Sequence, residues 1–89
     1  MRLDLFLKWC RVIARRPLAK ATCDASRIKV NGKLARPGYQ IQAEDIVVLD
    51  LPNRIMKLKV LALPDRAPGK VESRKMIEVL ENVRKKDDA

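Results

Sequence analysis

Arg15 and Arg16 stand side by side immediately before Pro17. Guanidinium groups carry a fixed charge and donate paired hydrogen bonds that match the oxygens of a phosphate. The nearest acids along the chain are Asp4 and Asp24, so we interpret both arginines as unneutralised. Proline suits the first position of a helix, which places Arg16 at the N-cap, where Ser, Thr, Asp or Asn is usual. Beside the free amides of a helix start, Arg16 is well placed to bind phosphate; the alternative is a tolerated surface arginine.

The positive charge of the chain is concentrated in its first part. The 89 residues carry a net charge of +9, and residues 1–36 hold ten Lys and Arg against two acids, a net charge of +8. Solubility alone would not require this asymmetry, which indicates nucleic acid or an anionic membrane surface as partner. The candidate binding cations are Arg2, Lys8, Arg11, Arg15, Arg16, Lys20, Arg27, Lys29 and Arg36.

Residues for enzymatic chemistry are scarce. The chain has no histidine, which rules out a Ser-His or Cys-His pair. Its three glycines form no phosphate-binding loop. Cys10 and Cys23 alone do not complete a zinc site, and their apolar positions predict buried thiols rather than a disulfide. We therefore expect no enzymatic activity, no metal and no cofactor.

Two helices must position the arginines. Residues 3–14 show the i, i+3, i+4, i+7 spacing of a helix with one buried face, formed by Leu3, Phe6, Leu7, Cys10 and Ile13. The same periodicity places Asp4, Lys8, Arg11 and Arg15 on a polar face, with Asp4 and Lys8 in the favourable order for an ion pair, and Trp9 between the faces. A second helix is predicted from Pro17 to about Ala25.

A β-hairpin is predicted over residues 27–36. Asn31-Gly32 is the strongest signal for a type I′ turn. This turn places Val30 opposite Lys33 and Lys29 opposite Leu34, with Ile28, Val30 and Ala35 facing the core. Arg27, Lys29 and Arg36 then share the other face with Leu34.

The remainder of the chain completes one small domain. Strands are predicted at residues 46–51 and 55–63, followed by a loop at 64–69. Residues 70–86 are predicted to form a final helix with Val71, Ile77 and Leu80 facing inward. The fold class is α+β: two N-terminal helices packed on a small antiparallel sheet with a hairpin, plus a C-terminal helix.

Three kinds of polyanion remain as partners. The first helix is basic and amphipathic with Trp9 at its boundary, as in membrane-surface helices, but Leu3, Phe6 and Leu7 are needed for the core. Binding to DNA by the two helices is disfavoured because the start of the second offers only Lys20 and Thr22 for base edges. Cations at a helix start and on neighbouring elements suit recognition of structured RNA by shape and phosphate contacts.

The sequence resembles the S-four RNA-binding domain family. The pattern Arg-Leu-Asp-x-x-Leu is matched by Arg2, Leu3, Asp4 and Leu7, and the start of the second helix by Arg16 and Ala19. The pattern Val/Ile-x-Val-Asn-Gly is matched by Ile28, Val30, Asn31 and Gly32. The resemblance covers about residues 1–63. Ser26 and Glu44 stand where the family commonly has glycine, and Ser26 costs about 1–2 kcal/mol if its backbone is left-handed.

The resemblance implies an S-four (αL-type) RNA-binding domain at 1–63, with the loop and C-terminal helix at 64–89 packed on it or extending it. The chain is most similar to short stand-alone members, the group of ribosome-associated quality control protein P and heat-shock protein fifteen. That similarity implies a cytoplasmic factor that binds ribosomal RNA of the large ribosomal subunit and peptidyl-tRNA, holding the tRNA while ribosome quality control protein H directs alanine tailing. The alternative is a factor like heat-shock protein fifteen, which rescues large subunits that carry nascent chain-tRNA.

We expect a monomer that binds RNA and no membrane. The candidate RNA-binding residues are the nine cations named above together with Asp4. Asp4 has two interpretations. It pairs with Lys8 or with an arginine and orients it, or it accepts a hydrogen bond from an RNA 2′-hydroxyl or base edge.

Overall fold

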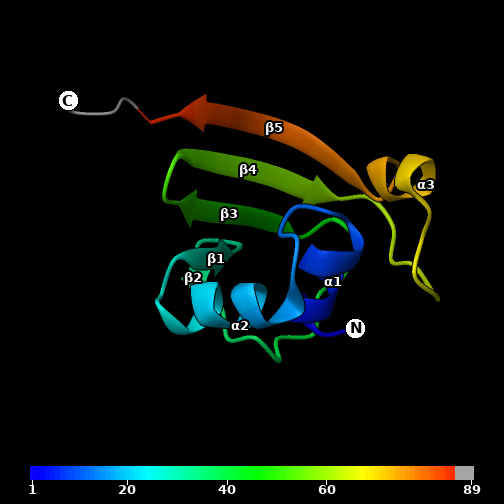
Figure 1. The fold of residues 1–89 in the computed structure, drawn as a ribbon, viewed down its shortest axis with the longest axis horizontal. Helices are drawn as coiled ribbons and strands as arrows, with labels where there is room; N and C mark the ends of the chain where they lie inside the picture. The colour runs from blue at the N-terminus through cyan, green and yellow to red at the C-terminus, as the bar shows by residue number, and fades with distance from the viewer. Residues whose placement is uncertain (86–89) are drawn as a thin grey trace.

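The computed structural model describes residues 1–85 of the chain. Two helices lie against one side of a five-stranded antiparallel sheet with strand order β2-β1-β3-β4-β5 (Figure 1). The elements are α1 (Leu3–Trp9), α2 (Arg16–Asp24), β1 (Ile28–Val30), β2 (Lys33–Leu34), β3 (Ile46–Leu51), β4 (Arg54–Val60), α3 (Lys70–Arg74) and β5 (Ile77–Arg84). This architecture confirms the predicted fold class. The proposed division of the chain at residue 63 stays a prediction. Residues 86–89, at the end of its second part, lie outside the residues that the structure describes.

The core is aliphatic, as the composition predicted. Leu3, Phe6 and Leu7 of α1 are completely buried. They pack against alternate residues of β3 and β4, among them Val47 and Leu58, which are also fully buried. Because side chains alternate across a strand, the helices bind one face of the sheet and the other face stays open.

The first helix is shorter than predicted. It ends at Trp9 rather than residue 14, because Arg11 has a left-handed backbone with φ of 60°. The amides of Val12 and Ile13 both donate to the carbonyl of Leu7, at 3.1 and 3.2 Å. The predicted buried face is nevertheless correct, since Ile13 is only 4% exposed.

The second helix begins one residue earlier than predicted. Arg15 is its N-cap and Arg16 its first residue, so the placement of Arg16 at the N-cap was wrong by one position. No side chain caps this end. Pro17 lies in the first turn, where the missing amide hydrogen costs nothing.

The hairpin has the predicted register. Lys29 pairs with Leu34 and Val30 with Lys33. Asn31 and Gly32 have φ of 52° and 83°, as the type I′ turn requires. The Asn31 side chain also fixes the turn to the start of β3: its Nδ2 donates to Asp45 Oδ1 at 3.0 Å, and its Oδ1 accepts from the Ile46 amide at 2.9 Å.

The predicted helix over 70–86 was wrong in extent. Within residues 70–85, only Lys70–Arg74 is helical, and β5 follows it. β5 pairs with β4 from the pair of Val60 and Ile77 to the pair of Arg54 and Arg84, with a bulge at Lys57 and Leu58. Val71 and Leu80, predicted to face inward, are 67% and 42% exposed. The unpaired backbone of β4 explains the difference, because a strand at a sheet edge leaves a row of free donors and acceptors. Residue 86 lies outside the described residues.

Oppositely charged residues occupy facing positions in the β4–β5 pair. Lys57 lies across from Glu81, and Lys59 lies across from Glu78. Oppositely charged cross-strand pairs each contribute roughly 0.2–1 kcal/mol. The predicted strand over 55–63 itself begins at Arg54 and ends at Val60.

Candidate nucleic-acid interface

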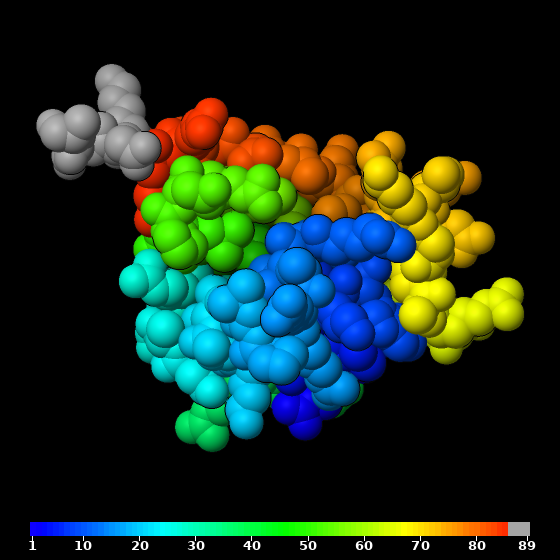
Figure 2. Space-filling view, in the orientation of Figure 1, coloured from blue at the N-terminus to red at the C-terminus, as the bar shows by residue number. Residues whose placement is uncertain are grey.

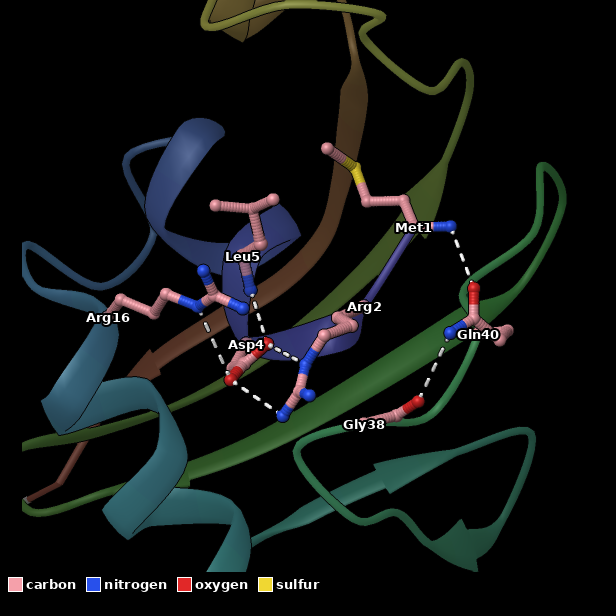
Figure 3. Close-up of polar contacts among 7 residues, drawn as sticks. All are labelled: Met1, Arg2, Asp4, Leu5, Arg16, Gly38 and Gln40. Atoms are coloured by element: carbon pink, nitrogen blue, oxygen red, sulfur yellow. Dashed lines mark hydrogen bonds and ion pairs between the residues drawn. The ribbon is translucent and has the colours of Figure 1, made fainter.

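A buried carboxylate joins two arginines at the meeting point of α1 and α2 (Figure 3). Asp4 is 2% exposed. Arg2 donates to it from Nε at 3.2 Å and from Nη2 at 3.4 Å, and Arg16 places Nε 3.5 Å from Asp4 Oδ2. The side chains of Arg2 and Arg16 remain 48% and 44% exposed. Asp4 therefore holds two guanidinium groups from different elements at the surface.

The electrostatics of Asp4 fit this role. Burial by itself raises the pKa of the carboxyl group. The hydrogen bonds from Arg2 and from the Leu5 amide, with the charges of Arg16 and Arg2, outweigh burial and hold the pKa below its ordinary value. Asp4 is therefore a carboxylate at neutral pH. Its interpretation as an arginine partner is confirmed, whereas the suggested partner Lys8 was wrong. A direct contact of Asp4 with RNA stays a prediction.

This arrangement corrects the view of Arg16 as an unneutralised cation. The folded chain brings Asp4 next to Arg16, although twelve positions separate them in the sequence. The neighbouring Arg15 is exposed. Two arginines and one carboxylate leave a local net charge of +1.

A groove beside the arginines collects further predicted cations. It has a volume of about 710 Å³, and its lining includes Arg2, Lys20, Arg36 and Tyr39. These residues come from the start of α1, from α2 and from the segment that follows β2. The groove combines three cations and one acid, Asp24, with an aromatic ring. Its net charge is therefore positive, and cations beside an aromatic ring are the combination that binds the backbone and bases of single-stranded nucleic acid.

The remaining predicted cations lie elsewhere. Lys29 sits on the open face of the sheet, since its neighbours Ile28 and Val30 are buried. Arg27 lines a separate apolar pocket with Leu18. Lys8 and Arg11 line a pocket at the other end of α1. All of these cations are exposed, but the structure does not gather them into one patch.

Tyr39 is a candidate residue that the sequence analysis missed. It is 38% exposed. Its carbonyl accepts from the Leu3 amide at 2.8 Å, and its amide donates to the Arg36 carbonyl at 3.0 Å, so its backbone is fixed to the start of α1. An aromatic residue next to a basic hairpin was the available signal, because aromatic residues among cations are typical of RNA-binding surfaces.

The cysteines are buried thiols, as predicted. Burial raises the pKa of Cys10 to about 12 and that of Cys23 to about 11, where Asp4 and Asp24 add to the effect. Within residues 1–85, no three His, Cys, Asp or Glu side chains gather where a metal ion could sit. In the same range, every helix is too short or too polar to cross a bilayer.

Two helices on an antiparallel sheet, with arginines at the helix junction, define a small RNA-binding domain, and the S4 domain family model matches residues 1–47. The chain is 38% identical over 84 residues to the RQC P-site tRNA stabilizing factor of Streptococcus pneumoniae, with 94% of each chain covered. It is 35% identical over 80 residues to the factor of the same name from Bacillus subtilis, with 90% and 92% covered. The chain therefore belongs to the S4-domain family of RQC P-site tRNA stabilizing factors.

Solved structures support the fold. Heat Shock Protein 15 of Vibrio cholerae, described as trimeric, superposes with a TM-score of 0.82 at 20% identity, with 89% of this chain and 80% of that chain covered. The solution structure of the hypothetical protein HP1423 gives a TM-score of 0.77 at 24% identity, with 91% and 98% covered.

Proposed function

We propose that this protein binds the obstructed large ribosomal subunit through ribosomal RNA and the P-site tRNA, and stabilises the peptidyl-tRNA during alanine tailing of the stalled chain. The proposal rests on the names of its relatives and on one structural observation, the pair of arginines held by Asp4. It includes action as a monomer alongside ribosome quality control protein H.

The arginine pair is suited to binding phosphate because Asp4 already orients both guanidinium groups. Each guanidinium has five N–H donors. Asp4 accepts two hydrogen bonds from Arg2 and forms an ion pair with Arg16 at 3.5 Å, and both arginine side chains remain about half exposed. Fixing a long side chain before binding lowers the entropy that must be lost on binding. The remaining donors can then bind RNA phosphates in paired geometry.

The fold also argues against a membrane surface as the partner. A membrane-bound amphipathic helix must present its apolar face to the acyl chains. In α1 this face consists of Leu3, Phe6 and Leu7, and all three are completely buried against the sheet. The helix therefore has no free apolar face to insert, whereas its cations remain exposed.

Arg16 provides the test. Arg16→Ala should lower the affinity for purified large subunits carrying tRNA by at least tenfold, because a charge-assisted bond to phosphate contributes about 1.5–3 kcal/mol. Arg16→Lys should recover only part of the affinity, since an ammonium lacks the planar fork. Arg74→Ala in α3 is the matched control: it removes an exposed cation away from the groove and should bind as wild type.

A melting curve must accompany each measurement, because Arg16 also neutralises the buried Asp4. A small loss of stability is expected for Arg16→Ala, with Arg2 still paired to the carboxylate. If Arg16→Ala binds as wild type while Arg36→Ala does not, the helix junction is a scaffold and the RNA-binding surface lies at the hairpin.

A further inference from the structure

A second cationic pocket lies at the opposite end of α1 from the arginine pair. It has a volume of about 420 Å³ and is lined by Lys8, Trp9, Arg11, Ala14, Ala67 and Pro68. Figure 2 shows the segment that supplies Ala67 and Pro68, in yellow, beside the blue N-terminal residues. Its volume falls within the roughly 300–1,000 Å³ range of small-molecule sites.

Trp9 lines this pocket and is not part of the buried core. The chain has one Trp, one Tyr and one Phe. Phe6 is completely buried in the core, whereas Trp9 is only half-buried and lines the pocket. A core so short of aromatic residues would gain stability from burying the largest one. The indole remains partly accessible in a pocket that also holds two cations, which suits a flat, negatively charged ligand.

The backbone next to the pocket supports a binding role. Arg11 has a φ of 60°, which is uncommon for a residue other than glycine. This conformation ends α1 and turns the chain, so that Arg11 lines the same pocket as Lys8 and Trp9. Strained backbone is often kept where it positions a functional side chain.

We propose that Trp9 stacks against an unpaired nucleobase of the bound RNA, with Lys8 and Arg11 holding the adjoining phosphates. An aromatic face flanked by cations matches the flat base and charged backbone of a nucleotide. The inference rests on the proposed RNA-binding function and adds a second contact region to it. Ala67 and Pro68 lie outside the segment matched by the S4 family model, so the C-terminal part of the chain completes this pocket.

The single tryptophan makes the proposal directly measurable. Protein-free large-subunit ribosomal RNA is titrated into the full-length wild-type protein, with excitation selective for Trp9. Stacking predicts strong quenching of the emission that follows the binding curve measured independently by gel shift. Trp9→Leu should lose roughly tenfold in RNA affinity and Trp9→Phe should lose less, because phenylalanine retains a face for stacking. Melting curves identify any variant that fails to fold.

The possible results separate this inference from the proposed function. Two results would overturn the stacking role and leave the RNA-binding function standing. The first is RNA binding in the gel shift without a change in Trp9 emission. The second is a folded Trp9→Leu variant that binds RNA as tightly as the wild type. Absence of RNA binding would overturn both. A blue shift with anionic phosphatidylglycerol vesicles that RNA does not reverse would assign the pocket to a membrane surface and overturn the inference as well.

Discussion

Asp4 shows how one residue connects structure and binding. Its carboxylate bonds to Arg2, lies close to Arg16 and accepts the amide of Leu5. It is buried in the folded protein and also adjoins the proposed RNA-binding surface. A change at Asp4 should therefore affect stability and affinity together, whereas a change at the exposed Arg15 should affect affinity alone.

The charge of Asp4 predicts a pH dependence of stability. Its pKa in the folded protein is below the ordinary value of 3.8. A depressed carboxyl pKa stabilises the fold above the unfolded-state pKa, and this contribution is lost as the pH falls through the folded-state pKa. Asp4→Asn should destabilise the protein by about 1–3 kcal/mol at pH 7. The difference from wild type should shrink as the pH falls below about 4.

Urea unfolding of both proteins at several pH values checks this prediction. Asp50, whose pKa its hydrogen bond with Lys85 also lowers, titrates in the same range but is present in both proteins, so it cancels in the comparison. A difference between the two proteins that stays constant from pH 7 to pH 3 would contradict the assigned role of the Asp4 charge.

At the scale of elements, turns that need left-handed backbone join the helices and strands. Asn31 and Gly32 suit such a conformation, whereas Ser26 and Glu44 adopt it with φ of 60° and 75°. These are the two positions where the resemblance to the S-four family led us to expect glycine. The left-handed backbone considered for Ser26 from the sequence is present in the structure. The ion pair of Glu44 with Lys59, at 2.8 Å, offsets part of the free-energy cost of the left-handed backbone at Glu44.

Ser26→Gly should stabilise the protein. Relief of the left-handed strain outweighs the greater freedom of glycine in the unfolded chain, for a net gain of about 0.5–1 kcal/mol. The melting temperature should rise by roughly 2–8 °C. Ser26→Ala is the control, because alanine keeps the strained Cβ. Equal melting temperatures for the two variants would show that Ser26 stores no strain. RNA affinity should change little in both, since Ser26 does not line the groove with Tyr39 but only an adjoining pocket.

At the scale of the whole molecule, the cations predict how binding responds to salt. Arg2 and Arg16 at the helix junction and Lys20 and Arg36 in the groove are the main candidates for phosphate contacts. Each phosphate neutralised adds about 0.7–0.9 to the slope of log affinity against log salt. Four contacts therefore predict a slope of roughly −3 for protein-free ribosomal RNA between about 50 and 200 mM salt, and the two contacts proposed for Lys8 and Arg11 would steepen it to about −5.

Variants at these positions refine the salt experiment. Lys20→Ala should reduce the slope by about one, whereas Lys75→Ala, an exposed cation that follows α3, should leave it unchanged. A flat salt response, or equal affinity for duplex DNA and structured RNA, would contradict recognition of RNA phosphates by this surface.

The sequence by itself determined the features that depend on near neighbours. The buried face of α1 followed from apolar spacing, and the register of the hairpin followed from the stereochemistry of Asn31-Gly32. The exposure of the candidate cations could also be predicted from the sequence, because charged side chains rarely become buried whatever the details of packing.

The tertiary structure alone decided what depends on distant partners. Residues 77–84 suited a helix in isolation, but the open edge of β4 supplied backbone partners and made them a strand. The contact between Asp4 and Arg16 requires the turn at Arg11 to bring α2 back against α1. The groove with Tyr39 and the pocket with Trp9 likewise join segments that only folding brings together, because nothing local in the sequence specifies the distances between them.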